Sequence, residues 1–151
     1  MKIRPSLMTI VCLLFASCQS IPKGRVVLPY GMEKPVKWTR AEKRQNLAVR
    51  QLNATRMASF HMIRLKGAEK PHVHDDHDLK VFMVSGKGMV HVGDLEYTML
   101  PGEALEIPKG LVHWAENQAK DASVVYATFT PPFDGKDYRV IENEPDSKRE
   151  T

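Results

Sequence analysis

The chain has 151 residues, of which 42% are hydrophobic and 26% charged, a length and composition typical of one globular domain. Its 22 basic and 18 acidic residues give a formal net charge of +4 at pH 7. The basic residues are scattered and form no stripe with aromatic side chains between them, so the sequence gives no support to a nucleic-acid-binding function.

The first residues are typical of a secretory signal peptide. Two basic residues precede an apolar run over residues 7–15, and small residues follow up to Cys18. The apolar run is short for a membrane-spanning helix, which needs about 20 residues. The four residues that end at Cys18, FASC, resemble a bacterial lipobox, with Phe in place of the usual Leu. We therefore predict that residues 1–17 are a signal peptide and that Cys18 is the lipidated first mature residue.

Lipidation at Cys18 would place the protein on a membrane surface. Several acyl chains, at about 0.8 kcal/mol per buried CH₂, anchor a protein stably without spanning the bilayer. We expect a lipoprotein of the cell envelope that faces the periplasm, and Gln19 resembles the residue that directs sorting to the outer membrane in Gram-negative cells. No disulfide is expected, because Cys12 leaves with the signal peptide and Cys18 carries the lipid.

Prolines and glycines recur through residues 18–37, which we predict to be a tether between the anchor and the folded domain. The charged segment 38–50 that follows is compatible with one short helix or with a first strand. A folded domain is predicted over residues 38–135. The polar residues 136–151 are predicted to form a loosely packed tail.

Short apolar runs separated by Gly and Pro fill the predicted domain, and no long helical pattern interrupts them. Many short strands at this spacing predict an all-β sandwich or barrel. The runs with strand composition are Ser59–Leu65, Leu79–Val84, Met89–Val92, Tyr97–Leu100, Ala104–Ile107 and Ser123–Phe129.

The stretch PHVHDDHDLK combines three histidines with three aspartates. His72, His74 and Asp78 are separated by even offsets, and in an extended chain residues at even offsets share one face. His77 stands at an odd offset and would point away unless a turn at residues 75–76 intervenes. Two imidazoles and a carboxylate on one face are suitable ligands for a divalent metal ion.

A second pattern lies in GEALEIPKGLVHWAEN, and it resembles a signature motif of the cupin superfamily. That motif has Gly, five residues, Pro, one residue, Gly, two residues, His, three residues and Asn. Its elements are matched by Gly102, Pro108, Gly110, His113 and Asn117. The family's first motif has Gly, five residues, His, one residue, His, three or four residues, Glu, six residues and Gly.

The first motif is matched less closely, by Gly67, His72, His74, Asp78 and Gly86. Four residues instead of five precede the first histidine, and Asp78 replaces Glu. If Gly86 fixes the alignment, Leu79 occupies the Glu position. The resemblance spans roughly residues 58–130. It implies a double-stranded β-helix, the jelly-roll barrel of cupins, with a short N-terminal extension.

The resemblance also implies a metal site. His72, His74 and His113 would be the imidazole ligands of a divalent Fe, Mn, Ni, Cu or Zn ion, and Asp78 is the candidate fourth ligand. His77 is its substitute if the turn directs it inward. No catalytic residue can be assigned from the sequence.

Two functions follow from this resemblance, and a third interpretation remains beside them. The first is a metal-dependent enzyme that acts on a small molecule, of dioxygenase or isomerase type. The second is a non-catalytic envelope protein that binds a small ligand or a sugar. The third is a dimerising scaffold in which the histidines have no role. Cupins commonly form homodimers, so a homodimer is also expected. Phosphate-binding glycine loops, nucleophile elbows and CxxC pairs are absent from the sequence.

Overall fold

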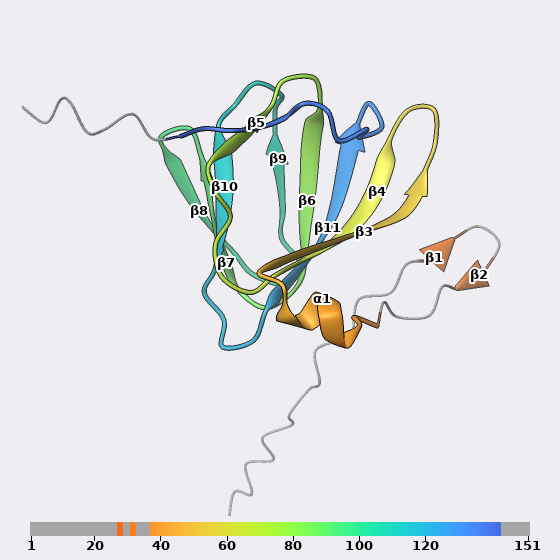
Figure 1. Cartoon of the computed structure of the whole chain (residues 1–151), viewed down its shortest axis with the longest axis vertical. Coiled ribbons are helices and arrows are strands. Elements are labelled where there is room, and N and C mark those ends of the chain that lie inside the picture. The colour runs from red at the N-terminus through yellow and green to blue at the C-terminus, as the bar shows by residue number, and fades with distance from the viewer. Residues whose placement is uncertain (1–26, 29–30, 33–36, 143–151) are drawn as a thin grey trace, which may run out of the picture.

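The computed structural model describes residues 27–28, 31–32 and 37–142 (Figure 1). The predicted signal peptide, Cys18 and most of the predicted tether lie outside these residues. Within the predicted tether, β1 (Val27–Leu28) and β2 (Gly31–Met32) form an antiparallel pair. Among the described residues no helix is long and apolar enough to cross a membrane.

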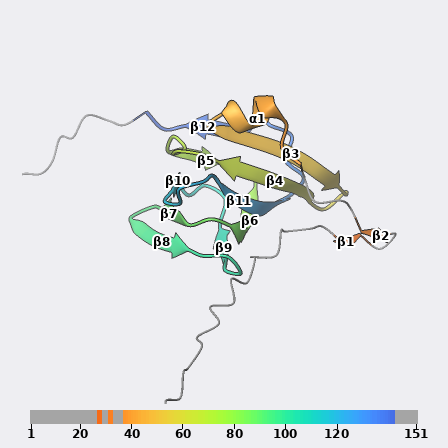
Figure 2. The same cartoon turned by 90° about the horizontal axis from the view of Figure 1, so that it is seen from below.

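Ten further strands form two antiparallel sheets of five strands each (Figures 1 and 2). The first sheet contains, in spatial order, β3 (Leu47–Ala54), β4 (Ser59–Leu65), β11 (Ser123–Thr130), β6 (Asp78–Ser85) and β9 (Ala104–Ile107). The second contains β12 (Tyr138–Val140), β5 (His72–His74), β10 (His113–Asn117), β7 (Gly88–Val92) and β8 (Leu95–Met99). This arrangement confirms the predicted all-β jelly-roll barrel.

The hydrophobic core lies between the two sheets, because alternate residues of each strand turn an apolar side chain inward. It combines side chains of the first sheet with side chains of the second. The buried members are Leu79, Met83, Val90, Met99, Ile107, Ala127 and Phe129. Each predicted strand is present, with ends shifted by two residues or fewer.

The segment predicted as one short helix or a first strand contains both. Helix α1 (Arg40–Arg44) begins with a capping box, in which Thr39 Oγ1 accepts from the Glu42 N–H and the Glu42 carboxylate accepts from the Thr39 N–H. Glu42 also pairs with Arg50 of β3 at 2.6 Å. These contacts hold α1 beside β3 (Figure 2).

The C-terminal segment differs from the loosely packed tail that the sequence predicts. Strand β12 pairs with β5, which places Tyr138 opposite His74 and Val140 opposite His72. The Ile141 N–H donates to the Pro71 carbonyl oxygen at 2.8 Å. Figure 1 shows this blue segment crossing one end of the two sheets. Residues as far as 142 therefore belong to the packed structure around β5.

Candidate metal centre

Three histidines from two neighbouring strands converge inside the barrel. His72 and His74 project from the same face of β5, and His113 lies opposite His72 across the antiparallel pair of β5 and β10. All three are buried, at 5%, 4% and 4% exposure. One ring nitrogen of each lies within 4.8 Å of the others. The local cause is the His-x-His spacing, since two steps along a strand return a side chain to the same face.

Each of these imidazoles is held by its Nδ1 atom. His72 Nδ1 donates to the Lys70 carbonyl at 2.8 Å, and His113 Nδ1 donates to the Leu111 carbonyl at 2.9 Å. His74 Nδ1 donates to the Asp137 carboxylate at 3.3 Å. Carbonyl and carboxylate oxygens only accept hydrogen bonds, so each Nδ1 carries the proton. Each Nε2 therefore keeps its lone pair.

The surroundings keep the three rings neutral. Burial lowers the pKa of His72 and of His74, although the hydrogen bond to Lys70 opposes this effect at His72 and the bond to Asp137 opposes it at His74. Burial, opposed by the hydrogen bond to Leu111 and assisted by the other two imidazoles, lowers the pKa of His113 to about 4. Metal ligation requires the neutral ring, which is the form present at pH 7.

The donor set fits a divalent transition metal. Nε2 of His113 is buried and has no hydrogen-bond partner, an arrangement that is costly unless another group satisfies the nitrogen. Imidazole is a preferred ligand of Zn, Cu, Fe and Ni. In each histidine the Nδ1–H partner fixes ring orientation and tautomer, which is the support that metal-binding histidines usually have. These residues could therefore hold an ion through three Nε2 atoms.

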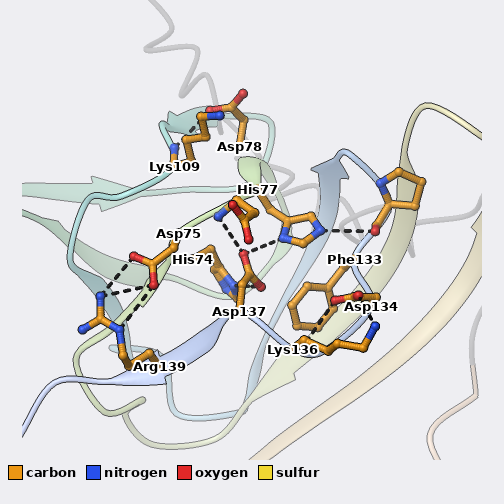
Figure 3. A network of polar contacts seen from close by, with 12 residues as sticks. His74, Asp75, His77, Asp78, Lys109, Phe133, Asp134, Lys136, Asp137 and Arg139 are labelled. Carbon is orange, nitrogen blue, oxygen red and sulfur yellow. Dashed lines mark hydrogen bonds and ion pairs between the residues drawn. The ribbon is translucent and has the colours of Figure 1, made fainter.

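Asp78 is not brought to the three histidines. Its Oδ1 accepts from the Lys109 backbone N–H at 3.0 Å, on the outside of the barrel end (Figure 3). Leu79 is buried and lines the interior instead. Because neighbouring residues of β6 face opposite sides of the sheet, Leu79 and Asp78 cannot both point inward. Leu79 thus takes the inward position next to the histidines.

His77 is also buried but is not a member of the cluster. Its Nδ1 contacts the Asp137 carboxylate at 2.5 Å and its Nε2 contacts the Pro132 carbonyl at 3.2 Å (Figure 3). Both partners are acceptors, so both nitrogens carry protons. Burial lowers the pKa of His77, but the contacts with Asp137 and Pro132 outweigh it and the net shift is upward. His77 is therefore a cation and has no lone pair for a metal.

Asp137 links the two kinds of histidine. One oxygen accepts from His74, and the other accepts from His77 and from the Asp76 N–H at 3.1 Å. Burial raises the pKa of Asp137, but these hydrogen bonds outweigh it and hold the pKa at about 2. The carboxylate thus orients a candidate ligand on one side and balances an imidazolium on the other. Asp137 is not indicated by any local sequence pattern, because it lies 63 residues from His74.

A cavity of about 150 Å³ adjoins the three histidines. Most of its wall consists of aliphatic and aromatic side chains, and the acidic residues Glu69 and Glu116 also line it. Oε2 of Glu69 accepts from the Ala115 N–H at 3.0 Å. Burial, opposed by this hydrogen bond, raises the pKa of Glu69 to about 7.

A one-residue irregularity brings Glu69 to the interior. Ala68 is bridged to Glu116 and His72 pairs with His113, so four steps on one strand oppose three on the other. The extra residue resets the alternation of faces, as a β-bulge does. Glu69 and His72 consequently both reach the interior although an odd offset separates them. Strict alternation from His72 would place Glu69 on the opposite face, so the sequence pattern does not indicate its inward position.

The structure is thus a two-sheet jelly-roll barrel in which three buried histidines converge. A model of the cupin domain matches residues 60–129. An uncharacterized protein of Aquifex aeolicus (strain VF5) is 36% identical over 98 residues, which are 65% of this chain and 80% of that protein. Residues 60–129 of this chain thus match the cupin domain.

Solved structures show the same fold. KdgF from Halomonas sp. is 24% identical, with a TM-score of 0.55 over 59% of this chain and 83% of KdgF. An oxalate oxidase in complex with glycolate is 20% identical, with a TM-score of 0.54 over 62% of this chain and 55% of the oxidase. At these identities the likeness concerns the fold alone.

Proposed function

We propose that this protein is a metal-binding cupin that holds one divalent transition-metal ion between His72, His74 and His113. The observation that supports the proposal is the set of three buried, neutral imidazoles with their Nδ1 atoms fixed by acceptors. A metal with three protein ligands and open positions supplies a centre that binds O₂ or polarises an oxygen atom of a substrate. We therefore favour a small-molecule metalloenzyme of dioxygenase type.

The residues of this chain would contribute orientation and exclusion of water. The Lys70 and Leu111 carbonyls and the Asp137 carboxylate fix the three rings, so little reorganisation accompanies ligation. The apolar cavity wall keeps bulk water from a bound molecule. Glu69 can hold a proton near neutral pH at the cavity wall, as its pKa of about 7 allows.

A non-catalytic ligand-binding or sugar-binding cupin is the second candidate. It is favoured by the position of Asp78, since among the described residues no carboxylate oxygen joins the three histidines as a fourth candidate ligand. Enzyme and binding protein are distinguished by the fate of a bound ligand. An enzyme converts it aerobically with consumption of O₂, whereas a binding protein releases it unchanged. The lipid anchor at Cys18 and the location in the envelope belong to the same proposal and are supported by the sequence of residues 1–18.

Elemental analysis of the natively purified protein tests the metal proposal. We expect about one transition-metal ion per chain, and loss of this metal in the His72→Ala/His74→Ala double variant with an unchanged circular-dichroism spectrum. Asp78→Ala is the matched control and should keep its metal, because the Asp78 carboxylate is occupied by the Lys109 N–H. A wild-type protein that stays metal-free after incubation with Fe, Mn, Ni, Cu and Zn would contradict the metal proposal.

A further inference from the structure

We infer that the cavity takes a small, mostly apolar molecule with a single hydroxyl group, which donates a hydrogen bond to Glu69, and not a sugar or a sugar phosphate. This inference deepens the proposed function and rests on it for the metal-facing end of the ligand. It names a substrate class from the shape and chemistry of the wall.

Size sets the first limit. The cavity measures about 150 Å³, and an apolar cavity of that volume accommodates a molecule about as large as benzene. Both sheets contribute to its wall, with Ile63 and Val125 from the first sheet and Val90 from the second. Phe129 and Phe133 stack on each other at 4.7 Å beside His74. An aromatic or branched aliphatic body suits this wall.

Charge sets the second limit. Among the described residues that line the cavity there is no lysine and no arginine. A single anionic oxygen could be balanced by the metal ion. A second anionic group, such as a phosphate ester, would lie in an apolar wall with Glu69 as its charged neighbour, and burying an unpaired charge is costly.

Hydrogen-bonding capacity sets the third limit. One Glu69 oxygen accepts from the Ala115 N–H, and within residues 37–142 no group donates to the other oxygen. Ser123 also lines the cavity, but its hydroxyl is engaged with the Lys87 carbonyl at 2.9 Å and with Asn117. One hydroxyl finds an acceptor at Glu69, whereas the aliphatic and aromatic carbons that make up most of the wall offer a sugar with several hydroxyls no replacement for its bonds to water.

Glu116 offers a matched control carboxylate. It belongs to the same region of the wall, but its side chain is 48% exposed and lies 3.4 Å from Nε2 of His91. A hydroxyl ligand in the cavity should therefore depend on Glu69 and not on Glu116.

The test uses the full folded domain with ¹³C-methyl-labelled methionine, in zinc-loaded and metal-free form. Met83 lines the cavity, whereas Met57 is 74% exposed, so the Met83 methyl signal reports binding and Met57 serves as the internal reference. The probes are phenol, toluene, glucose and glucose 6-phosphate. We expect phenol and toluene to shift the Met83 signal, with phenol about tenfold tighter, and the two sugars to leave it in place.

Two variants then test the hydrogen bond between the ligand hydroxyl and Glu69. Glu69→Gln should weaken phenol binding about tenfold, to the level of toluene, and leave toluene binding unchanged. The Gln oxygen is taken by the Ala115 N–H, and the amide nitrogen that remains cannot accept a hydrogen bond from phenol. Glu116→Gln should bind both probes as the wild type does. A Met83 shift by glucose or glucose 6-phosphate at lower concentration than by phenol overturns the inference, and unchanged phenol binding in Glu69→Gln does so as well. The probe ranking in the wild type stands independently of whether a variant folds.

The metal-free arm separates this inference from the proposed function. If zinc does not bind but phenol still binds in a Glu69-dependent manner, the metal proposal fails and the ligand class stands. If zinc binds and phenol does not, the ligand class is wrong and the metal proposal stands.

Discussion

At the scale of single residues, Asp137 is the side chain through which the C-terminal segment reaches the candidate metal centre. It accepts from His74, a candidate ligand, and from the cationic His77 (Figure 3). Carboxylates in this position fix the orientation of a ligand histidine and increase its basicity, and their removal typically costs 10- to 100-fold in metal affinity.

We therefore predict that Asp137→Asn lowers zinc affinity by about 10- to 100-fold. The amide has no negative charge to balance His77, and it cannot accept from both histidines as well as the carboxylate does. The measurement is a competition titration with a zinc chelator. Asp134→Asn is the control, because Asp134 pairs with the exposed Lys136 and contacts no candidate ligand. Equal affinities of Asp137→Asn and wild type would show that His74 is oriented without this carboxylate.

Glu69 and His113 make opposite contributions to stability in the metal-free protein. The pKa of Glu69 is raised from 4.5 to about 7, so the stability that its neutral form contributes is present below pH 4.5 and lost as pH rises toward 7. The pKa of His113 is lowered from 6.5 to about 4, so stability is lost as pH falls from 6.5 toward 4. Each effect is on the order of 3 kcal/mol, and between pH 4.5 and 6.5 the two oppose each other.

We predict that Glu69→Gln exposes the histidine contribution. The metal-free variant should gain stability as pH rises from 4.5 to 6.5, whereas the wild type changes less over this window. Above pH 7 the variant should be the more stable protein, because it no longer contains a buried carboxylate. Urea denaturation at a series of pH values measures both effects. Parallel pH profiles for the two proteins would mean that Glu69 ionises in the folded state as it does in the unfolded chain.

At the scale of elements, β12 closes the side of the site that β5 leaves open. Its Tyr138 ring lies 4.7 Å from the His72 ring and 5.7 Å from the His74 ring. The loop before it supplies Asp137. This short strand therefore contributes both the cover over two candidate ligands and the acceptor of one of them.

We predict that a chain ending at Gly135 loses zinc affinity to at least the extent of Asp137→Asn and unfolds at a lower temperature. The pKa of His72 should rise, because burial is the main cause of its lowering. A chain ending at Glu142 keeps β12 and its bond from Ile141 to Pro71, so it should match the wild type. Zinc titration and thermal unfolding of the two truncated chains make the comparison. Wild-type zinc binding by the shorter chain would contradict the role of β12.

The elements and residues that the sequence predicted are those set by local rules. Apolar runs between Gly and Pro located six strands, and the His-x-His spacing placed two imidazoles on one face. The likeness to the second cupin motif supplied His113. Asp78 was included by its even offset from His74, but the turn at residues 75–76 intervenes and β6 directs Leu79 inward.

Glu69, Asp137 and β12 depend on pairings that local patterns do not contain. Glu69 reaches the cavity through one extra residue in the strand pairing, which nothing in the sequence marks. Asp137 acts across 63 residues, from a polar segment that has the composition of a frayed tail. Tyr138 and the other residues of β12 are held by backbone pairing with β5. This pairing does not depend on apolar side chains, so the polar composition of the segment did not indicate a strand.

At the scale of the whole molecule, a metal ion that binds the folded protein and not the unfolded chain stabilises the entire fold. The candidate ligands come from β5 and β10, and β12 and the Asp137 loop are attached to β5, so unfolding of the second sheet would separate these residues. The stabilisation is RT ln(1 + [L]/Kd), about 2.7 kcal/mol when the free metal is 100 times Kd.

We predict that zinc at 100 times its Kd raises the melting temperature of the wild type by about 5–10 °C, since about 1 kcal/mol corresponds to roughly 2–4 °C in a protein of this size. His113→Ala should show no such rise at the same zinc concentration, because one of three ligands is gone. His91→Ala is the control: His91 stacks on Trp114 at 4.2 Å, outside the cluster, and its variant should keep the zinc-dependent rise. Scanning calorimetry with and without zinc measures all three proteins. A zinc-dependent rise in His113→Ala equal to that of the wild type would place the bound ion elsewhere than at the three histidines.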